Sequence, residues 1–93
     1  MEVTEIKEKV VPVLRSAGVL RAALFGSAAR GEATKESDVD ILVSLPKGTS
    51  LFDFVALKLK LEDVLRTKVD LVEYASIKSD LKSYILKDEL ALI

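Results

Sequence analysis

Three aspartates and a glycine-serine pair are the residues of this sequence whose types and spacing could do chemistry. Asp38 and Asp40 open one apolar run, Asp70 lies within a second, and Gly26 and Ser27 end a third. Carboxylate oxygens are the ligands that Mg²⁺ and Mn²⁺ prefer, and glycine lets a backbone approach a phosphate closely. The combination predicts phosphate chemistry beside divalent cations.

The spacing of the aspartates indicates how they would act together. Residues two apart in a strand point to one face, with α-carbons roughly 6.5 to 7 Å apart, so Asp38 and Asp40 should project side by side. Pairing of the Asp70 strand next to them would add a third carboxylate. Three such groups repel one another unless cations neutralise them. Two Mg²⁺ ions about 3.5 to 4 Å apart would suit this site, and Mn²⁺ could replace them.

The glycine-serine turn would supply the groups that hold phosphate. Gly26 permits close approach, and amides at the start of a following helical turn can donate to phosphate oxygens. Ser27 adds a hydroxyl and Arg30 a charged donor. Each motif alone also has a structural interpretation: an ordinary turn, a solvated strand end, an edge-strand acid or a surface arginine. Their joint order along the chain favours the functional interpretation.

The elements that must position these residues follow from periodicity and from breaker residues. The sequence predicts a small α/β fold: a mixed sheet of three to four strands with helices packed against it. Thr4 should cap the first helix, Pro12 should kink or shorten it, and Gly18 should stop it. Ser50 and Asp53 form a predicted capping box for the second long helix. The expected helices span residues 4–17, 50–66 and 77–88, with a helical turn at 27–30, and the expected strands span 19–25, 39–43, 68–73 and 90–93.

Composition restricts the class of protein. The 93 residues should form a single domain, 1–93, and their net charge of −1 shows no basic stripe for binding long nucleic acids. The chain lacks cysteine and histidine, so any metal must be held by oxygen. There is no apolar run of the roughly 20 residues that a membrane span needs, and the charged N-terminus differs from a signal peptide. We therefore expect no membrane contact and a cytoplasmic location.

The long pattern GSxARGExxxxSDxDxxV, followed by a later single aspartate, resembles the minimal nucleotidyltransferases of the DNA polymerase β-like superfamily. The likeness covers nearly the whole chain and is strongest to the MntA-type antitoxins. It implies the nucleotidyltransferase fold and a magnesium-dependent transfer of AMP from ATP to a hydroxyl. By the same resemblance, Asp38, Asp40 and Asp70 would be the catalytic metal ligands. Gly26, Ser27 and Arg30 would bind the nucleotide.

The resemblance also implies a partner, because MntA-type proteins transfer AMP to a tyrosine of a HepT-type toxin encoded nearby. Two alternatives stay open. The chain could neutralise its partner by contact alone, without catalysis, or it could modify a small molecule such as an antibiotic, with a dimer mate forming the acceptor pocket. Neutralisation by catalysis and neutralisation by contact can be told apart, because only catalysis needs the carboxylates.

The helix over residues 50–66 carries two apolar faces. One face should meet the sheet, and it consists of Phe54, Leu57, Leu61, Val64 and Leu65. Phe52, Val55 and Leu59 fall on the opposite side. This second stripe is either covered by the termini or the last helix, or it contacts a partner, which includes a second copy of the chain.

Overall fold

A mixed sheet lies at the centre of the computed structural model, which describes residues 2–31, 38–80, 87 and 89–93. Within these residues the sheet has four strands, β1 (Arg21–Phe25), β2 (Val39–Ser44), β3 (Val69–Glu73) and β4 (Leu90–Ala91). Their order is β3-β2-β1-β4. β1 is antiparallel to both β2 and β4, whereas β2 and β3 are parallel. The predicted α/β class and mixed sheet are confirmed, and the short strand at the C-terminal end is an edge strand as expected.

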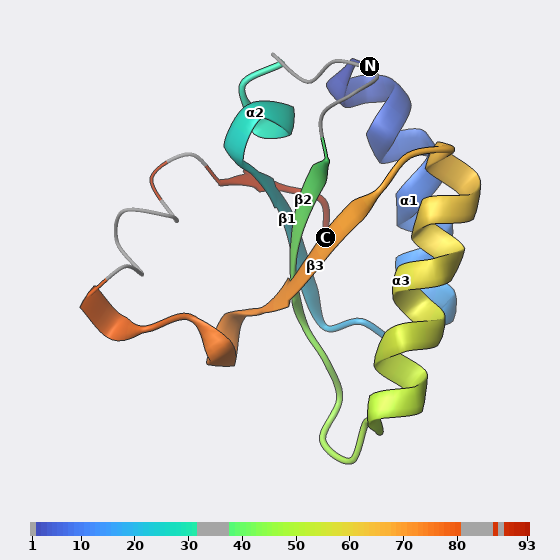
Figure 1. The fold of residues 1–93 in the computed structure, drawn as a ribbon, viewed down its shortest axis with the longest axis vertical. Coiled ribbons are helices and arrows are strands. Elements are labelled where there is room, and N and C mark those ends of the chain that lie inside the picture. The colour runs from blue at the N-terminus through green and yellow to red at the C-terminus, as the bar shows by residue number, and fades with distance from the viewer. Residues whose placement is uncertain (1, 32–37, 81–86, 88) are drawn as a thin grey trace.

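Two long helices cover one face of this sheet, α1 (Val3–Ser16) and α3 (Leu51–Leu65) (Figure 1). Alternation along the strands sends Ala22 and Leu24 from β1 into the same core as Ile41 and Val43 from β2. The helices bury Leu14 and Leu61 against them. α3 is also the crossover that parallel strands require, because β2 and β3 cannot be joined by a tight turn. The connection that builds the core therefore also sets β3 beside β2.

The ends of α3 follow local sequence signals. Ser50 Oγ accepts a hydrogen bond from the Asp53 N–H at 3.1 Å, and Asp53 Oδ2 accepts one from the Ser50 N–H at 3.3 Å. This reciprocal pair is the predicted capping box. The helix ends at Leu65, and the C-cap residue Arg66 has a left-handed φ of 58°. Phe54 and Val64 pack against the core with Leu57, Leu61 and Leu65, so the predicted inner face is confirmed.

The start of α1 corrects the sequence prediction. Thr4 is not the cap, because the helix already begins at Val3 and Glu2 occupies the N-cap position in an extended conformation without a side-chain hydrogen bond. Pro12 lies inside the helix, which runs on to Ser16. The predicted stop at Gly18 is confirmed: its φ is +75°, and the following N–H of Val19 reaches back to the Leu14 carbonyl at 3.1 Å.

The second face of the sheet receives the chain that follows β3. Tyr74 begins a 3-10 turn, η1 (Tyr74–Ser76), and its hydroxyl donates a 2.6 Å hydrogen bond to Glu89 Oε1. Arg21 donates to the same oxygen at 2.9 Å and lies over the Tyr74 ring, 4.4 Å from its centroid. Burial, followed by the bond to Glu89, raises the pKa of Tyr74, which keeps the hydroxyl a donor. The expected helix at 77–88 falls mostly outside the described residues.

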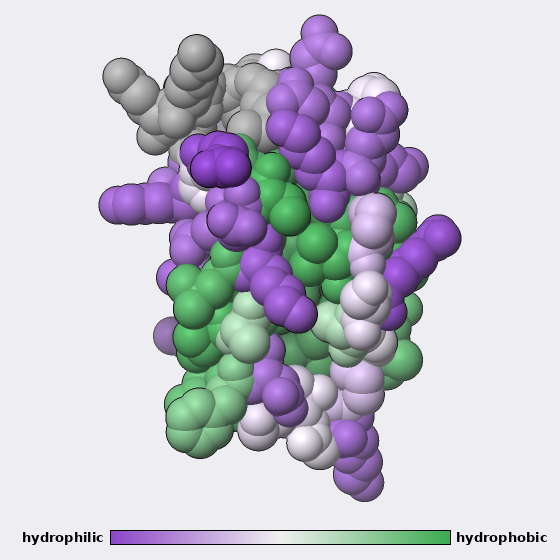
Figure 2. Space-filling model, turned by 90° about the vertical axis from the view of Figure 1, so that its right-hand side faces the viewer, coloured by the Kyte–Doolittle hydropathy of each residue, from purple (hydrophilic) through white to green (hydrophobic). Residues whose placement is uncertain are grey.

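The outward side of α3 is exposed. Phe52 is 88% exposed, Leu59 57% and Val55 44%, and the neighbouring Leu51 is 76% exposed. Figure 2, which looks onto α1 and α3, shows hydrophobic surface among the charged side chains there. The prediction of a second apolar face is confirmed. The alternative that the termini or the last helix cover it is not what the described part of the chain shows.

Candidate active site

The predicted site residues meet where β1 ends and β2 and β3 begin. Strand pairing places Phe25 opposite Asp40, and Asp40 opposite Asp70. These three positions form one row across three neighbouring strands, with adjacent backbones about 4.8 Å apart. Because paired residues share a face of the sheet, the carboxylates of Asp40 and Asp70 lie side by side. The predicted pairing of the Asp70 strand beside the Asp40 strand is confirmed.

Gly26 brings the backbone against Asp40. It follows the last residue of β1, begins the short helix α2 (Gly26–Ala29) and has a φ of +64°. A Cβ at this position would lie 2.6 Å from Asp40 Oδ2, inside the distance that real Cβ atoms keep. Both the conformation and the contact require glycine. The sequence predicted a close approach of backbone to a phosphate here, and the structure adds a close approach to Asp40.

Carboxylate charges are crowded around Asp40, at the end of the sheet where β2 and β3 begin. Burial raises the pKa of Asp40, and the charges of Asp70 and then Asp38, together with a hydrogen bond to Asp70, raise it further. A bound cation would relieve this repulsion. Perturbed carboxyl groups of this kind gather at functional sites.

The three predicted metal ligands are not equally placed. Asp40 and Asp70 are paired across β2 and β3, whereas Asp38 directly precedes β2; Asp38 and Asp70 are exposed, and Asp40 is half-buried. In the described part of the chain, no three acidic side chains already surround one point. Asp38 nevertheless lies near enough for its charge to act on Asp40. The all-oxygen donor set and the crowding at Asp40 fit a hard divalent cation.

The predicted nucleotide-binding residues lie on and after α2. Ser27 is half-buried in the first turn of this helix, and Arg30 is exposed directly after its last residue. The predicted helical turn is thus confirmed, shifted by one residue toward the N-terminus. The first N–H groups of a helix have no partner within it, and this turn begins at Gly26, next to Asp40.

Two contacts were missed by sequence reasoning, one beside the site and one at the opposite end of the strands. The side chain of Glu62 accepts a hydrogen bond from the Val69 N–H, directly before Asp70. The second feature is the cluster of Arg21, Tyr74 and Glu89, which joins residues from distant parts of the chain. No local sequence pattern predicts either contact, because each depends on how separate elements pack.

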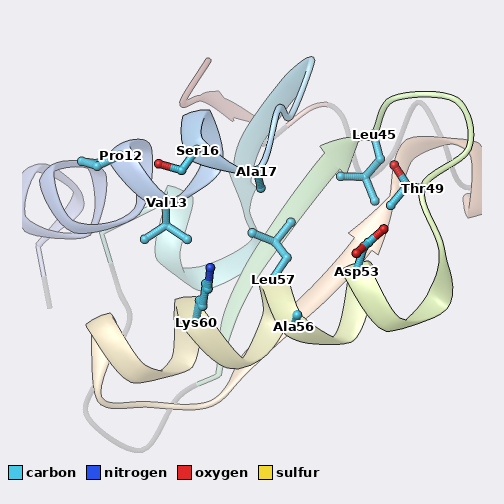
Figure 3. Close-up of a pocket in the computed structure, with 10 residues that line it drawn as sticks. All are labelled: Pro12, Val13, Ser16, Ala17, Leu45, Thr49, Asp53, Ala56, Leu57 and Lys60. Atoms are coloured by element: carbon cyan, nitrogen blue, oxygen red, sulfur yellow. The ribbon is translucent and has the colours of Figure 1, made fainter.

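A hollow of about 450 Å³ lies away from the carboxylates, between α1 and α3. Figure 3 shows Pro12, Val13 and Ser16 on one side of it, facing Ala56 and Lys60 on the other. Neither Asp40 nor Asp70 lines it, and its Asp53 already belongs to the capping box. The hollow therefore lacks the neighbouring carboxylates that a metal site for phosphate chemistry needs.

A family comparison decides between the possible identities of this site. The family model for the nucleotidyltransferase domain matches residues 5–93. The chain belongs to the nucleotidyltransferase family. This nucleotidyltransferase is 46% identical over 93 residues to a candidate protein adenylyltransferase of Methanocaldococcus jannaschii, a match that covers 100% of both chains. It is 44% identical over 71 residues to the protein adenylyltransferase MntA of Thermococcus cleftensis, covering 76% of this chain and 72% of MntA.

Solved structures agree with the sequence relatives. The nucleotidyltransferase superposes on a candidate minimal nucleotidyltransferase with a TM-score of 0.84 and 34% identity, covering 97% of this chain and 95% of that chain. A chain from a toxin-antitoxin crystal structure with AMP-PNP gives a TM-score of 0.80 and 27% identity, over 94% of this chain and 72% of that chain. The predicted family, fold and enzyme class are confirmed. In the described part of the nucleotidyltransferase, no helix is long and apolar enough to cross a membrane.

Proposed function

We propose that this nucleotidyltransferase transfers AMP from ATP to a tyrosine of a HepT-type toxin and thereby acts as its antitoxin. The observation that carries the proposal is the pairing of Asp40 with Asp70 at the start of β2 and β3, where Gly26 also brings the backbone close to Asp40. Relatives support the acceptor class: MntA of Thermococcus cleftensis is a protein adenylyltransferase, and a structural neighbour is a toxin-antitoxin complex with AMP-PNP.

The position of each residue indicates its proposed role in binding metal or phosphate. Asp38, Asp40 and Asp70 would hold one or two Mg²⁺ ions, or Mn²⁺, and the metal would neutralise charge on the triphosphate and on the departing pyrophosphate. The backbone at Gly26 and Ser27 would donate to phosphate oxygens, and Arg30 would add a charged donor. These contacts hold the nucleotide with its α-phosphorus facing the acceptor.

The transfer itself is a single displacement. The tyrosine oxygen forms a bond to the α-phosphorus of ATP as the bond from that phosphorus to the bridging oxygen breaks. Pyrophosphate leaves with the electron pair, and Asp70 accepts the proton of the tyrosine hydroxyl. In-line displacement of this kind depends on positioning and on charge stabilisation more than on covalent chemistry by the protein.

The test mixes the protein with ATP labelled at the α-phosphate, Mg²⁺ and the HepT-type protein encoded nearby. Wild type should label the toxin and silence it, and Asp40→Asn and Asp70→Asn should each abolish labelling. Asp63→Asn is the matched control, because Asp63 is exposed on α3 and its side chain makes no hydrogen bond or ion pair with the described residues. Labelling that survives both active-site substitutions would refute the assignment.

The same experiment separates the remaining hypotheses. Asp40→Asn protein that still silences the toxin without labelling it would identify a binding module that acts by contact. Labelling of a small hydroxyl compound in place of the toxin would identify a small-molecule transferase. Measuring the mass of the protein in solution during the assay would show whether a second copy is needed for either activity.

A further inference from the structure

The first residues of β3 lie at an open edge of the sheet. The order β3-β2-β1-β4 gives β3 only one strand neighbour among the described residues, so half of its backbone groups face away from the sheet. The Val39 N–H of β2 donates to the Lys68 carbonyl at 3.0 Å, so the backbone N–H and C=O of Lys68 point toward β2. Successive residues of a strand alternate in direction. The N–H of Val69 therefore points outward, away from β2.

Glu62 supplies the partner for this outward donor. Its Oε2 accepts the hydrogen bond of the Val69 N–H at 2.9 Å. The backbone carbonyl of the same residue accepts the Arg66 N–H at 2.8 Å, at the left-handed residue that ends α3. One residue thus secures the end of α3 with its backbone and the start of β3 with its side chain. The short connection between the two elements is held at both ends.

The position of this contact matters because Asp70 follows Val69 directly. Asp70 is paired with Asp40, and two carboxylates on neighbouring strands repel each other. β3 has no described strand on its outer side to resist that repulsion. A hydrogen bond from the outer side to the residue before Asp70 opposes the movement that the repulsion favours. A charged acceptor makes this a stronger bond than a neutral one.

We propose that Glu62 is a positioning residue that holds the beginning of β3, and with it the Asp70 carboxylate, in register beside Asp40. Glu62 is not among the residues proposed to bind the metal or the nucleotide. The inference rests on the proposed function in one respect, namely that Asp70 acts in the transfer. It predicts that the site depends first on an acceptor oxygen within reach of Val69, and that the negative charge at position 62 contributes less.

The first test compares the steady-state kinetics of AMP transfer by Glu62→Ala, Glu62→Gln and the control Asp63→Ala. Loss of one hydrogen bond to a charged acceptor should lower kcat of Glu62→Ala about tenfold, with the KM for ATP within about twofold of wild type. Glu62→Gln keeps a carbonyl oxygen and should recover most of kcat. An unchanged kcat in Glu62→Ala, or an equal loss in Glu62→Gln, would overturn the proposal.

The second test needs no activity. Hydrogen exchange of the Val69 and Asp70 amides, measured by NMR, should accelerate about tenfold or more in Glu62→Ala and stay at the wild-type rate in Asp63→Ala. Glu62→Asp, which keeps the charge but shortens the side chain, should behave like Glu62→Ala and serves if the alanine variant does not fold. Wild-type exchange rates in both Glu62→Ala and Glu62→Asp would refute the role of Glu62. A wild type that exchanges as expected but transfers no AMP would instead refute the proposed function.

Discussion

Gly26→Ala is the substitution for which the structure gives the sharpest expectation. Two separate effects act at this position. The φ of +64° is left-handed, which costs an alanine about 1 to 2 kcal/mol. The added methyl group would also lie 2.6 Å from Asp40 Oδ2 and 3.6 Å from its Cγ, so the carboxylate must move. Both effects lower stability, and the second also displaces a proposed metal ligand.

The magnitudes of the two effects can be separated. The conformational cost alone should lower Tm by roughly 4 to 8 °C for each kcal/mol in a domain of this size. Displacement of a reacting group by about 1 Å can lower activity about 100-fold, and we expect a loss of that order in the kcat of AMP transfer. Gly48→Ala is the matched control, because Gly48 has a φ of +91° and its Cβ would meet nothing within 4 Å. It should lose stability but keep its kcat.

The assay combines thermal unfolding with AMP transfer kinetics on the three proteins. A double-mutant cycle adds a direct measure of the contact: in an Asp40→Ala background the carboxylate is gone, so Gly26→Ala should lower stability by its conformational cost alone. Equal kcat values for Gly26→Ala and Gly48→Ala would refute the reasoning. So would a Gly26→Ala stability loss that is the same with and without the Asp40 carboxylate.

Two further predictions concern stability. Asp40→Asn should raise Tm at pH 7 in the absence of divalent cations. Burial and the charges of Asp70 and Asp38 raise the pKa of Asp40 above its usual 3.8. Wild type therefore loses stability as this carboxyl group ionises with rising pH. The advantage should vanish below pH 3.8, where wild type is protonated as well, and an advantage that grows on acidification would contradict this account. Leu61→Ala should lower the free energy of unfolding by about 2 to 5 kcal/mol, because Leu61 is 0% exposed in the core. Leu59 is 57% exposed, so Leu59→Ala should change the free energy of unfolding by less than about 0.5 kcal/mol, measured by urea titration. Similar losses in both variants would show that the outer face of α3 is covered in solution.

Much of the architecture could be predicted from short patterns. The capping box at Ser50 and Asp53, the stop at Gly18 and the apolar strand at Val39–Ser44 are set by residues within a few positions of one another. The motif that predicted the family is also nearly continuous in sequence. Local prediction was wrong at the start of α1, where a plausible cap, Thr4, lies inside the helix. A capping residue acts only if the backbone bends at that point, and here the extended residue is Glu2.

The sequence by itself determined the residue types of the site and the strand or turn that carries each one, since these depend on local periodicity, caps and glycine conformations. Only the tertiary structure decided which atoms meet. Three contacts join different elements of the fold. Gly26 lies so close to Asp40 that an added Cβ would be 2.6 Å from its Oδ2, Val69 donates a hydrogen bond to Glu62, and Arg21 donates one to Glu89. Such contacts depend on strand register and helix packing, in which a shift of one residue redirects every side chain, and no local pattern encodes them.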